Sequence, residues 1–396
     1  MKRNILLPLF CLSFVLFSCS SDDDNGGGII EIPAVESAVL DIESGGSNEP
    51  NQVYIDLSTE ETTVVRRDSW ELGFVSSQNR VVLNASILVS AAKLEGIYDI
   101  DAVSENTQLA EELDIKTSSN VDTTLTTVNA LLKGLPVGYT MYGNLDKGIS
   151  FTDSKEGDLN RTAIGNIATA EAEAEVFLVS LGKAIPEEPA EIGSVKHTGE
   201  NRGFYKIKVF MDNSDYVLQY APLSSDTHEE VVITKDEVYN FKAFSLKNGK
   251  EVNVEPTRGK WDLNFTSVYS YYDFMSNLNV GLTYSDYMVY NIDNGVGVYM
   301  VLTEAPGEGE GAAVVPTDEP SYDEFTLEDV VENELVFDDR TVIGSEWRNA
   351  FGDASLKSDR YYIIKDVDGN FYKLQFTALL NEDGERGYPQ IRYDLL

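Results

Sequence analysis

The sequence predicts an all-β protein with minor α content, made of two tandem, mainly antiparallel β domains. In residues 360–376 aromatic or β-branched residues occupy every second position, and Asp, Gly and Asn interrupt the run. Two alternating runs joined by such a turn indicate a β-hairpin. Residues 203–221 repeat this pattern more loosely, and residues 70–74 and 261–265 share the spacing Trp-acid-Leu-x-Phe. These shared landmarks predict that the chain is duplicated.

The first half is expected to start with a strand, because Val53, Ile55 and Leu57 alternate with polar residues. On a pleated strand this alternation buries one face and exposes the other. Short strands with turns between them follow. Residues 121–132 carry apolar residues at helical spacing, which predicts a helix. Residues 170–181, AEAEAEVFLVSL, alternate strictly and are interpreted as a strand, although their alanines favour helix.

The second half has the same landmarks in the same order, and the hairpin at 203–221 is aligned with the hairpin at 360–376. The first half has a longer segment between its tryptophan strand and its hairpin. Duplication with one large insertion is the simplest interpretation. The predicted domains are residues 49–235 and residues 236–396.

Charge and cysteine content limit the function. The formal net charge of −37 disfavours nucleic acid and anionic headgroups as partners. The chain has two cysteines, Cys11 and Cys19, both near its start. The remainder therefore contains no disulfide and no thiolate metal site.

The N-terminus is typical of a secreted protein. Residues 1–18 combine a basic start with an apolar run and a small residue, as a signal peptide does. The sequence around Cys19 resembles a bacterial lipobox, which implies lipidation of that cysteine; an ordinary residue beside a cleavage site is the alternative. Residues 19–48 begin as an acidic, Gly-rich tether. The acidic run resembles a surface-export signal, although a solvated linker fits the same residues. We expect an outer-membrane lipoprotein that faces outward.

Several linked motifs resemble one family. They are WDLNF from Trp261, the hairpin RYYIIKDVDGNFYKLQF, the closing ERGYPQIRYDLL, and residues 54–74. Together they are similar to the HmuY-like haem-binding lipoproteins of Bacteroidetes. The resemblance implies an antiparallel β fold and capture of haem for a TonB-dependent outer-membrane receptor. It also implies two axial haem ligands, histidines or methionines, between the tryptophan strand and the terminal hairpin.

The candidate ligands lie in the first half. In the second half the corresponding segments, 304–334 and 347–351, contain neither histidine nor methionine. In the first half Met141 and His197 lie where the family keeps its ligands, and haem iron needs such donors. A solvated loop histidine and a core methionine are the alternative interpretations. His228 and Met211 are weaker candidates.

Other chemistries have less support. DVDGN at 366–370 resembles part of a calcium loop, but the flanking strands indicate a hairpin turn instead. With two histidines and no nucleophile elbow, a Ser-His-Asp triad is disfavoured. The predicted function is non-catalytic binding in haem or iron acquisition. The alternative is a surface lipoprotein of the same fold that binds a glycan or a partner protein.

Overall fold

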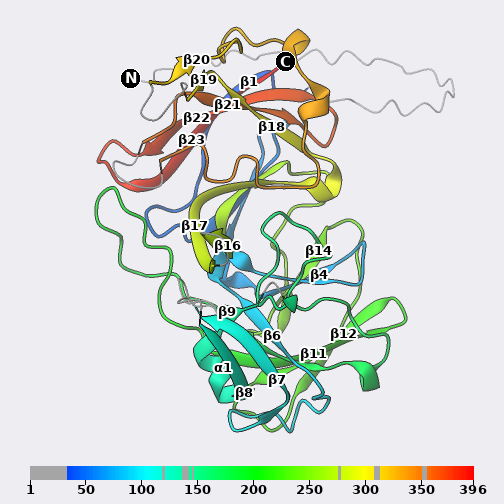
Figure 1. The fold of residues 1–396 in the computed structure, drawn as a ribbon. Coiled ribbons are helices and arrows are strands. Elements are labelled where there is room, and N and C mark those ends of the chain that lie inside the picture. The colour runs from blue at the N-terminus through cyan, green and yellow to red at the C-terminus, as the bar shows by residue number, and fades with distance from the viewer. Residues whose placement is uncertain are drawn as a thin grey trace, which may run out of the picture. The chain divides into compact units, whose positions relative to one another are not determined.

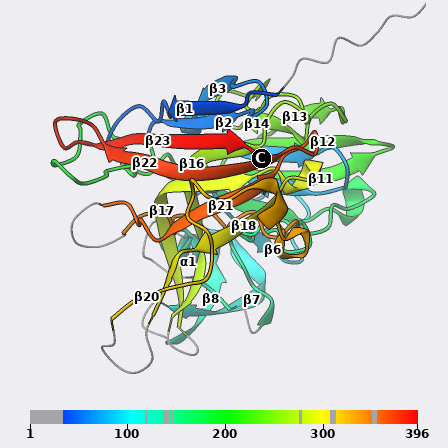
Figure 2. The same ribbon diagram turned by 90° about the horizontal axis from the view of Figure 1, so that it is seen from above.

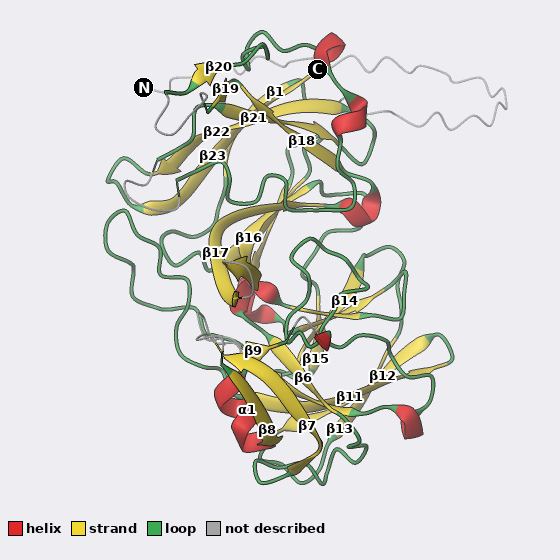
Figure 3. Cartoon of the chain, viewed as in Figure 1, coloured by secondary structure: helices red, strands yellow, loops and turns green. Residues whose placement is uncertain are grey.

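Strands dominate the chain (Figure 3). The computed structural model describes residues 34–117, 121–135, 142–144, 147–274, 278–306, 313–349 and 355–396. It places 42% of the residues in strands and 8% in helices, which confirms the predicted fold class. Residues 34–396 form one compact unit. Within the described ranges, every helix is too short or too polar to cross a bilayer.

One five-stranded antiparallel sheet has the order β13-β12-β11-β10-β6. It contains the predicted hairpin of residues 203–221 as β11 and β12. Its tight turn has Asn213 in the left-handed region at φ 56°, a conformation that asparagine tolerates. The strands are β6 (Ser90–Leu94), β10 (Val176–Ser180), β11 (Phe204–Asp212), β12 (Asp215–Pro222) and β13 (Glu229–Ile233).

A second five-stranded antiparallel sheet has the order β1-β23-β22-β21-β18. Figure 2 shows β1, from the start of the described chain, beside β23 from its end. In the β21–β22 turn, Asp366 Oδ1 accepts the backbone N–H groups of Asp368 (3.0 Å) and Asn370 (2.7 Å). The DVDGN segment is thus a hairpin turn. The strands are β1 (Ser37–Asp41), β18 (Gly297–Leu302), β21 (Arg360–Lys365), β22 (Phe371–Leu380) and β23 (Arg386–Leu395).

Two four-stranded sheets join the halves by exchange of hairpins. Their orders are β15-β14-β4-β5 and β17-β16-β2-β3. The hairpin at the start of each half pairs with the strand that follows the other half's tryptophan, as Figure 1 shows for β14 and β4. Each predicted domain, residues 49–235 and residues 236–396, therefore pairs one of its hairpins with a strand of the other domain. The domain boundaries stay a prediction. The strands are β2 (Asn51–Ile55), β3 (Thr62–Arg66), β4 (Leu72–Val75), β5 (Val81–Leu83), β14 (Phe241–Ser245), β15 (Lys250–Val252), β16 (Leu263–Phe274) and β17 (Leu278–Tyr290).

Smaller elements fill the connections. A three-stranded sheet has the order β8-β7-β9, and β19 pairs with β20. These elements are β7 (Gln108–Thr117), β8 (Asp122–Thr127), β9 (Tyr142–Gly143), β19 (Glu304–Ala305), β20 (Val315–Pro316), helix α1 (Val128–Gly134) and the 3₁₀ helices η1 (Arg67–Ser69), η2 (Ala85–Ile87), η4 (Glu171–Glu173), η5 (Ile292–Asn294), η6 (Leu327–Asp329) and η7 (Glu332–Glu334).

Two predicted elements differ in their extent. The helix expected over 121–132 begins only at Val128, where Thr127 Oγ1 accepts the N–H of Ala130; the threonines before it form β8, since β-branched residues favour strands. The strand expected over 170–181 covers only β10. Its first part is η4, a 3₁₀ turn closed by the N–H of Ala174 on the carbonyl of Glu171.

The prediction of one wet face is wrong for two strands. All residues from Val53 to Leu57 are buried. The face expected to be exposed is covered, since the Tyr54 ring packs edge-on against Trp261 with centroids 5.1 Å apart. In β21 the residues Tyr361 to Ile364 are also all buried. Tyr361 packs against Tyr322, whose segment covers the outer face.

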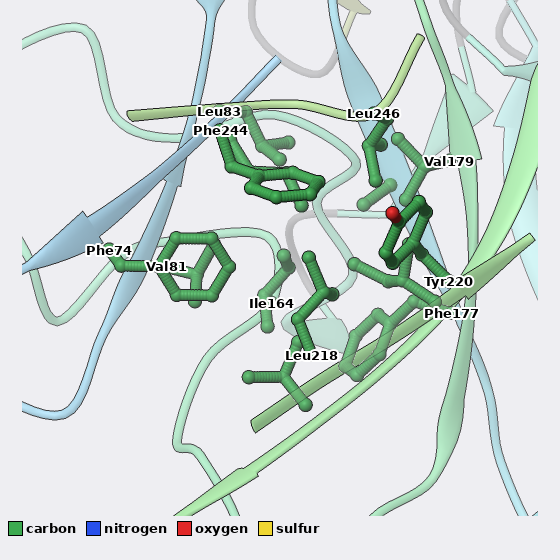
Figure 4. Packing of buried hydrophobic residues seen from close by; sticks show 14 of the residues in the cluster. Phe74, Val81, Leu83, Ile164, Phe177, Val179, Leu218, Tyr220, Phe244 and Leu246 are labelled. Carbon is green, nitrogen blue, oxygen red and sulfur yellow. The ribbon is translucent and has the colours of Figure 1, made fainter. Parts of the chain in front are cut away.

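Each half has its own hydrophobic core, and each core contains residues supplied by the other half. Figure 4 shows Phe244 and Leu246, from β14 and the turn after it, in one cluster with Phe74 and Leu218. The second large core takes Val53 from β2. Each exchanged hairpin therefore buries its apolar residues in the core of the other half.

The two Trp-acid-Leu-x-Phe segments are held by the same contacts. Asn84 Nδ2 donates to the carbonyls of Arg67 (2.7 Å) and Trp70 (2.9 Å). Asn291 Nδ2 donates to the carbonyls at the corresponding positions, Arg258 (3.0 Å) and Trp261 (3.1 Å). A 3₁₀ helix follows each asparagine. Tandem duplication itself stays a prediction.

The two aligned hairpins take different places in their sheets. Counted from β6, the hairpin β11–β12 occupies the third and fourth places of its sheet. Counted from β18, the hairpin β21–β22 occupies the second and third places. The alignment of the two hairpins stays a prediction, together with the duplication.

Candidate functional site

His197 lies in the loop between β10 and β11, beside buried arginines. Its backbone carbonyl accepts a hydrogen bond from Arg67 Nη2 at 3.1 Å. Its ring atom Nε2 is buried without a hydrogen-bond partner among the described residues. Burial, and then the charges of Arg67, Arg348 and Arg386, lowers the pKa of His197 to about 3. The imidazole is therefore neutral at physiological pH, the form that can bind a metal.

The surroundings of His197 carry excess positive charge. Arg386 Nη2 donates to Asp286 Oδ2 at 2.6 Å, and Arg348 Nε lies 3.1 Å from the same oxygen. The neighbouring carboxyl of Glu49 is fully buried. Burial, and then the charge of Asp286, raises the pKa of Glu49 well above its usual range. Three arginines, Arg67, Arg348 and Arg386, thus stand against the two carboxyl groups of Glu49 and Asp286.

The other predicted site residues do not join His197. Met141 and Cys19 lie outside the described residues, so neither is placed. His228 Nδ1 lies within hydrogen-bond distance of Asp101 Oδ1, 2.9 Å away, on the surface of the first half. Met211 is a core residue, only 6% exposed. Of these candidates, His197 is the one with an unpartnered donor atom.

A separate cavity lies between the two tryptophan segments. It holds about 130 Å³ of space, below the roughly 300–1,000 Å³ of pockets for drug-sized ligands. The aromatic residues that line it are Tyr54, Trp70, Phe241, Trp261, Tyr269 and Tyr290, and four of them form two ring pairs. Trp70 stacks on Phe241 with centroids 5.2 Å apart, and Tyr54 meets Trp261 edge-on. Each pair combines a tryptophan of one half with a ring from the hairpin exchanged by the other half, so the exchange builds the cavity.

Five polar side chains line this cavity with an atom that has no hydrogen-bond partner among the described residues. Each side chain is at least nine-tenths buried, and most buried polar atoms in folded proteins have a partner. Buried polar atoms without partners are therefore gathered at this cavity. The atoms are Gln52 Nε2, Trp70 Nε1, Glu255 Oε2, Trp261 Nε1 and Asn264 Oδ1.

Glu255 is the carboxyl group of this set. Its Oε1 accepts the backbone N–H groups of Asn240 (2.6 Å) and Phe241 (3.1 Å). Burial raises the pKa of Glu255 to about 8. At neutral pH the group is protonated, and the proton belongs on Oε2 because Oε1 already accepts two hydrogen bonds. Glu255 therefore presents a hydroxyl donor to the cavity.

Residues 153–162 form part of the rim. Arg340 Nε donates to the carbonyl of Lys155 at 2.9 Å, and Arg80 Nε donates to the carbonyl of Leu159 at 2.9 Å. Gly157 adopts φ +90°, and a Cβ there would lie 2.9 Å from Ile292 Cδ1. Glycine thus allows this loop of the first half to lie against residues of the second.

Sequence reasoning did not find this cavity. Trp70 and Trp261 stood out as repeat landmarks, but nothing showed that their indoles line one space. Glu255 is one acid among 67 acidic residues and has no motif. Only the paired Trp-acid-Leu-x-Phe spacing was a usable signal.

Comparison with known proteins gives one family. The model of the family described as HmuY protein matches residues 48–393. This match spans both halves. No curated protein and no solved structure matches the chain.

Proposed function

Because the chain belongs to the HmuY family, we propose that it is a haem-binding lipoprotein of the cell surface. A lipid on Cys19 anchors it in the outer membrane, and it supplies haem to a TonB-dependent receptor without catalysing a reaction. Membership of a haem-binding family supports the ligand class. The observation that carries the proposal for this chain is the neutral, unpartnered imidazole of His197.

The chemistry around His197 suits an anionic metalloporphyrin. Haem iron takes an imidazole nitrogen as an axial ligand, and Nε2 of His197 is available for that bond. The two propionates of haem are anions, and Arg348 and Arg386 are cations beside the ring. In a chain with net charge −37, such a positive cluster is the place where a carboxylate ligand is favoured.

Haem binding at His197 requires local movement, because Nε2 is buried. The loop that carries His197 is tied by backbone hydrogen bonds from Lys196 N to Ser47 O (2.9 Å) and from Gly199 N to Ala184 O (2.8 Å). Further bonds tie the same loop, among them Ala184 N to Glu200 O (2.8 Å), Ser194 N to Glu191 O (2.9 Å) and Asn48 Nδ2 to the carbonyl of Pro186 (2.7 Å). Exposure of Nε2 breaks some of these loop contacts and leaves the ladders of β10 and β11 intact.

Haem titration followed at the Soret band tests the proposal. The wild-type chain is expected to give a band distinct from that of free haem, and His197→Ala is expected to abolish it because the axial nitrogen is lost. His228→Ala is the matched control, since His228 pairs with Asp101. Met141→Ala is expected to shift the band if its sulfur is the second ligand.

Two results would contradict the assignment. One is a wild-type spectrum identical to that of free haem. The other is an equal loss of the band in His197→Ala and His228→Ala, which would show a nonspecific effect. In either case the alternative function, binding of a glycan or a partner protein by the same fold, would be favoured. The polar cavity between the tryptophans is the observation that supports that alternative.

A further inference from the structure

We propose that the cavity between Trp70 and Trp261 binds a neutral sugar ring. The site is separate from His197, so the inference does not depend on haem binding. It rests on three features of the cavity: unpartnered polar atoms, a lining without an excess of positive charge, and aromatic walls around a space of limited volume.

The polar atoms require a ligand with several hydroxyl groups. The indole N–H groups of Trp70 and Trp261 only donate hydrogen bonds. The amides of Gln52 and Asn264 contain both donors and acceptors, and each has an unpartnered atom. A hydroxyl group donates and accepts at once, so a polyhydroxyl ring can satisfy this mixture of groups. A buried polar group without a hydrogen-bond partner costs stability, so a ligand that forms the missing hydrogen bond is favoured.

The charges that line the cavity do not favour an anion. Glu255 is protonated at neutral pH, as its raised pKa of about 8 requires. Burial raises the pKa of Asp153 only to about 6, so this group is a carboxylate at neutral pH, and its oxygens accept the backbone N–H groups of Ala163 (2.8 Å) and Leu83 (2.6 Å). The other charged lining residues are two cations, Lys155 and Arg340, and two acids, Asp158 and Asp293. The cations therefore do not outnumber the acids, and an anionic ligand finds no excess of positive charge.

The walls and the volume select a single ring. Apolar C–H faces of a sugar pack on aromatic side chains, which combine an apolar surface with a polar edge. The space of about 130 Å³ lies below the roughly 300–1,000 Å³ of pockets for drug-sized ligands, so it admits at most one ring, either a free monosaccharide or the end of a glycan. A porphyrin is too large for it.

Calorimetric titration of the purified chain with neutral monosaccharides, including the common hexoses and N-acetylhexosamines, tests the proposal. At least one is expected to bind with a Kd of about 1 mM or tighter. Trp70→Phe and Trp261→Phe keep the ring and remove the N–H group, so each is expected to weaken binding by about tenfold. Trp347→Phe is the matched control, because its Nε1 donates to Asp286 O, away from the cavity.

The pH dependence gives a second readout. Wild-type affinity is expected to fall above about pH 8, as Glu255 ionises; the charges that act on its pKa are those of Asp293, which raises it, and Arg258, which lowers it. Glu255→Gln keeps a neutral donor and is expected to bind at all these pH values without that fall. Failure of every sugar to bind would overturn the proposal, as would tighter binding of sulfate or a sugar acid. Equal weakening by Trp347→Phe would overturn it too. If His197→Ala binds the sugar with wild-type affinity, the sugar site is independent of the haem site, and each proposal can fail without the other.

Discussion

Glu71 and Asp262 occupy the same position in the two halves but are neutralised in different ways. Each follows a tryptophan and accepts a backbone N–H from the hairpin of the other half, Leu246 N on Glu71 (2.7 Å) and Leu57 N on Asp262 (2.8 Å). Glu71 also binds Arg202 at 2.6 Å, and both side chains are buried. For Asp262 no ion pair is found among the described residues; a second backbone N–H, from Val367, completes its contacts.

We call each of these contacts, a buried carboxyl group that accepts an N–H from the hairpin of the other half, a joint. The difference shows that the charge of the buried carboxyl group in such a joint can be neutralised in two ways. In both halves the carboxyl group binds the turn between the two strands of the exchanged hairpin, so its acceptor oxygens are the shared requirement. The first half meets the cost of burying a charge with a cation, whereas in the second half burial raises the pKa of Asp262 to about 7. The two joints should therefore respond differently to mutation and to pH.

The largest expected effect comes from removing the cation of the first joint. Arg202→Met leaves the Glu71 carboxylate buried without its partner, which is expected to cost about 3–5 kcal/mol of unfolding free energy. Denaturant unfolding followed by tryptophan fluorescence measures this. The double variant Glu71→Gln with Arg202→Met is expected to lose less, because no charge stays buried.

An exposed ion pair supplies the control for that experiment. Arg66 and Asp68 are 3.0 Å apart with side-chain exposures of 59% and 25%, so Arg66→Met is expected to cost less than about 1 kcal/mol. If Arg202→Met cost no more than Arg66→Met, the account of Glu71 as a cation-dependent joint would be wrong.

The next largest effect is expected from the asparagine that each half uses to bind the backbone of its tryptophan segment. Asn84→Ala and Asn291→Ala each leave two buried carbonyls without a donor, at an expected cost of about 2 kcal/mol. Asn84 Oδ1 also accepts Ser86 N (3.1 Å) and Ser86 Oγ (2.6 Å), whereas Asn291 Oδ1 accepts Asn240 Nδ2 (3.1 Å), so the loss at Asn84 is expected to be the larger. Asn160→Ala, at an exposed turn, is expected to change stability by less than about 0.5 kcal/mol. A silent change at Asn84 or Asn291 would show that the joints are not equivalent.

Local pattern allowed much of the fold to be predicted. The hairpins at 203–221 and 360–376 follow from alternation and turn residues, which act over a few neighbours. Burial of both faces of β2 did not follow, because Tyr54 is covered by Trp261, a residue more than 200 positions away. The exchange of hairpins has the same origin: identical strand patterns fit either partner, and only the tertiary structure selects one.

The candidate sites were predictable to different degrees. His197 was found because histidine is rare in this chain and haem chemistry needs a donor, but its arginine neighbours come from three distant segments. Glu255, Gln52 and Asn264 were not found, since ordinary polar residues become informative only once burial is known. A site of this kind is defined by missing partners, which no local motif records.

The smallest effect separates the joints by pH. Because the pKa of Asp262 is raised to about 7 on folding, the folded chain holds a proton that the unfolded chain has released between about pH 4 and pH 7. This contribution is fully present at low pH and is lost as pH rises, by roughly 1 kcal/mol between pH 5 and pH 6. Asp262→Asn is expected to flatten the pH dependence by that amount, whereas Asp368→Asn, on an exposed part of the neighbouring turn, is expected to leave it as in the wild type. An unchanged slope in Asp262→Asn would mean that Asp262 is buried as a charge, and the contrast with Glu71 would then reduce to the presence or absence of Arg202.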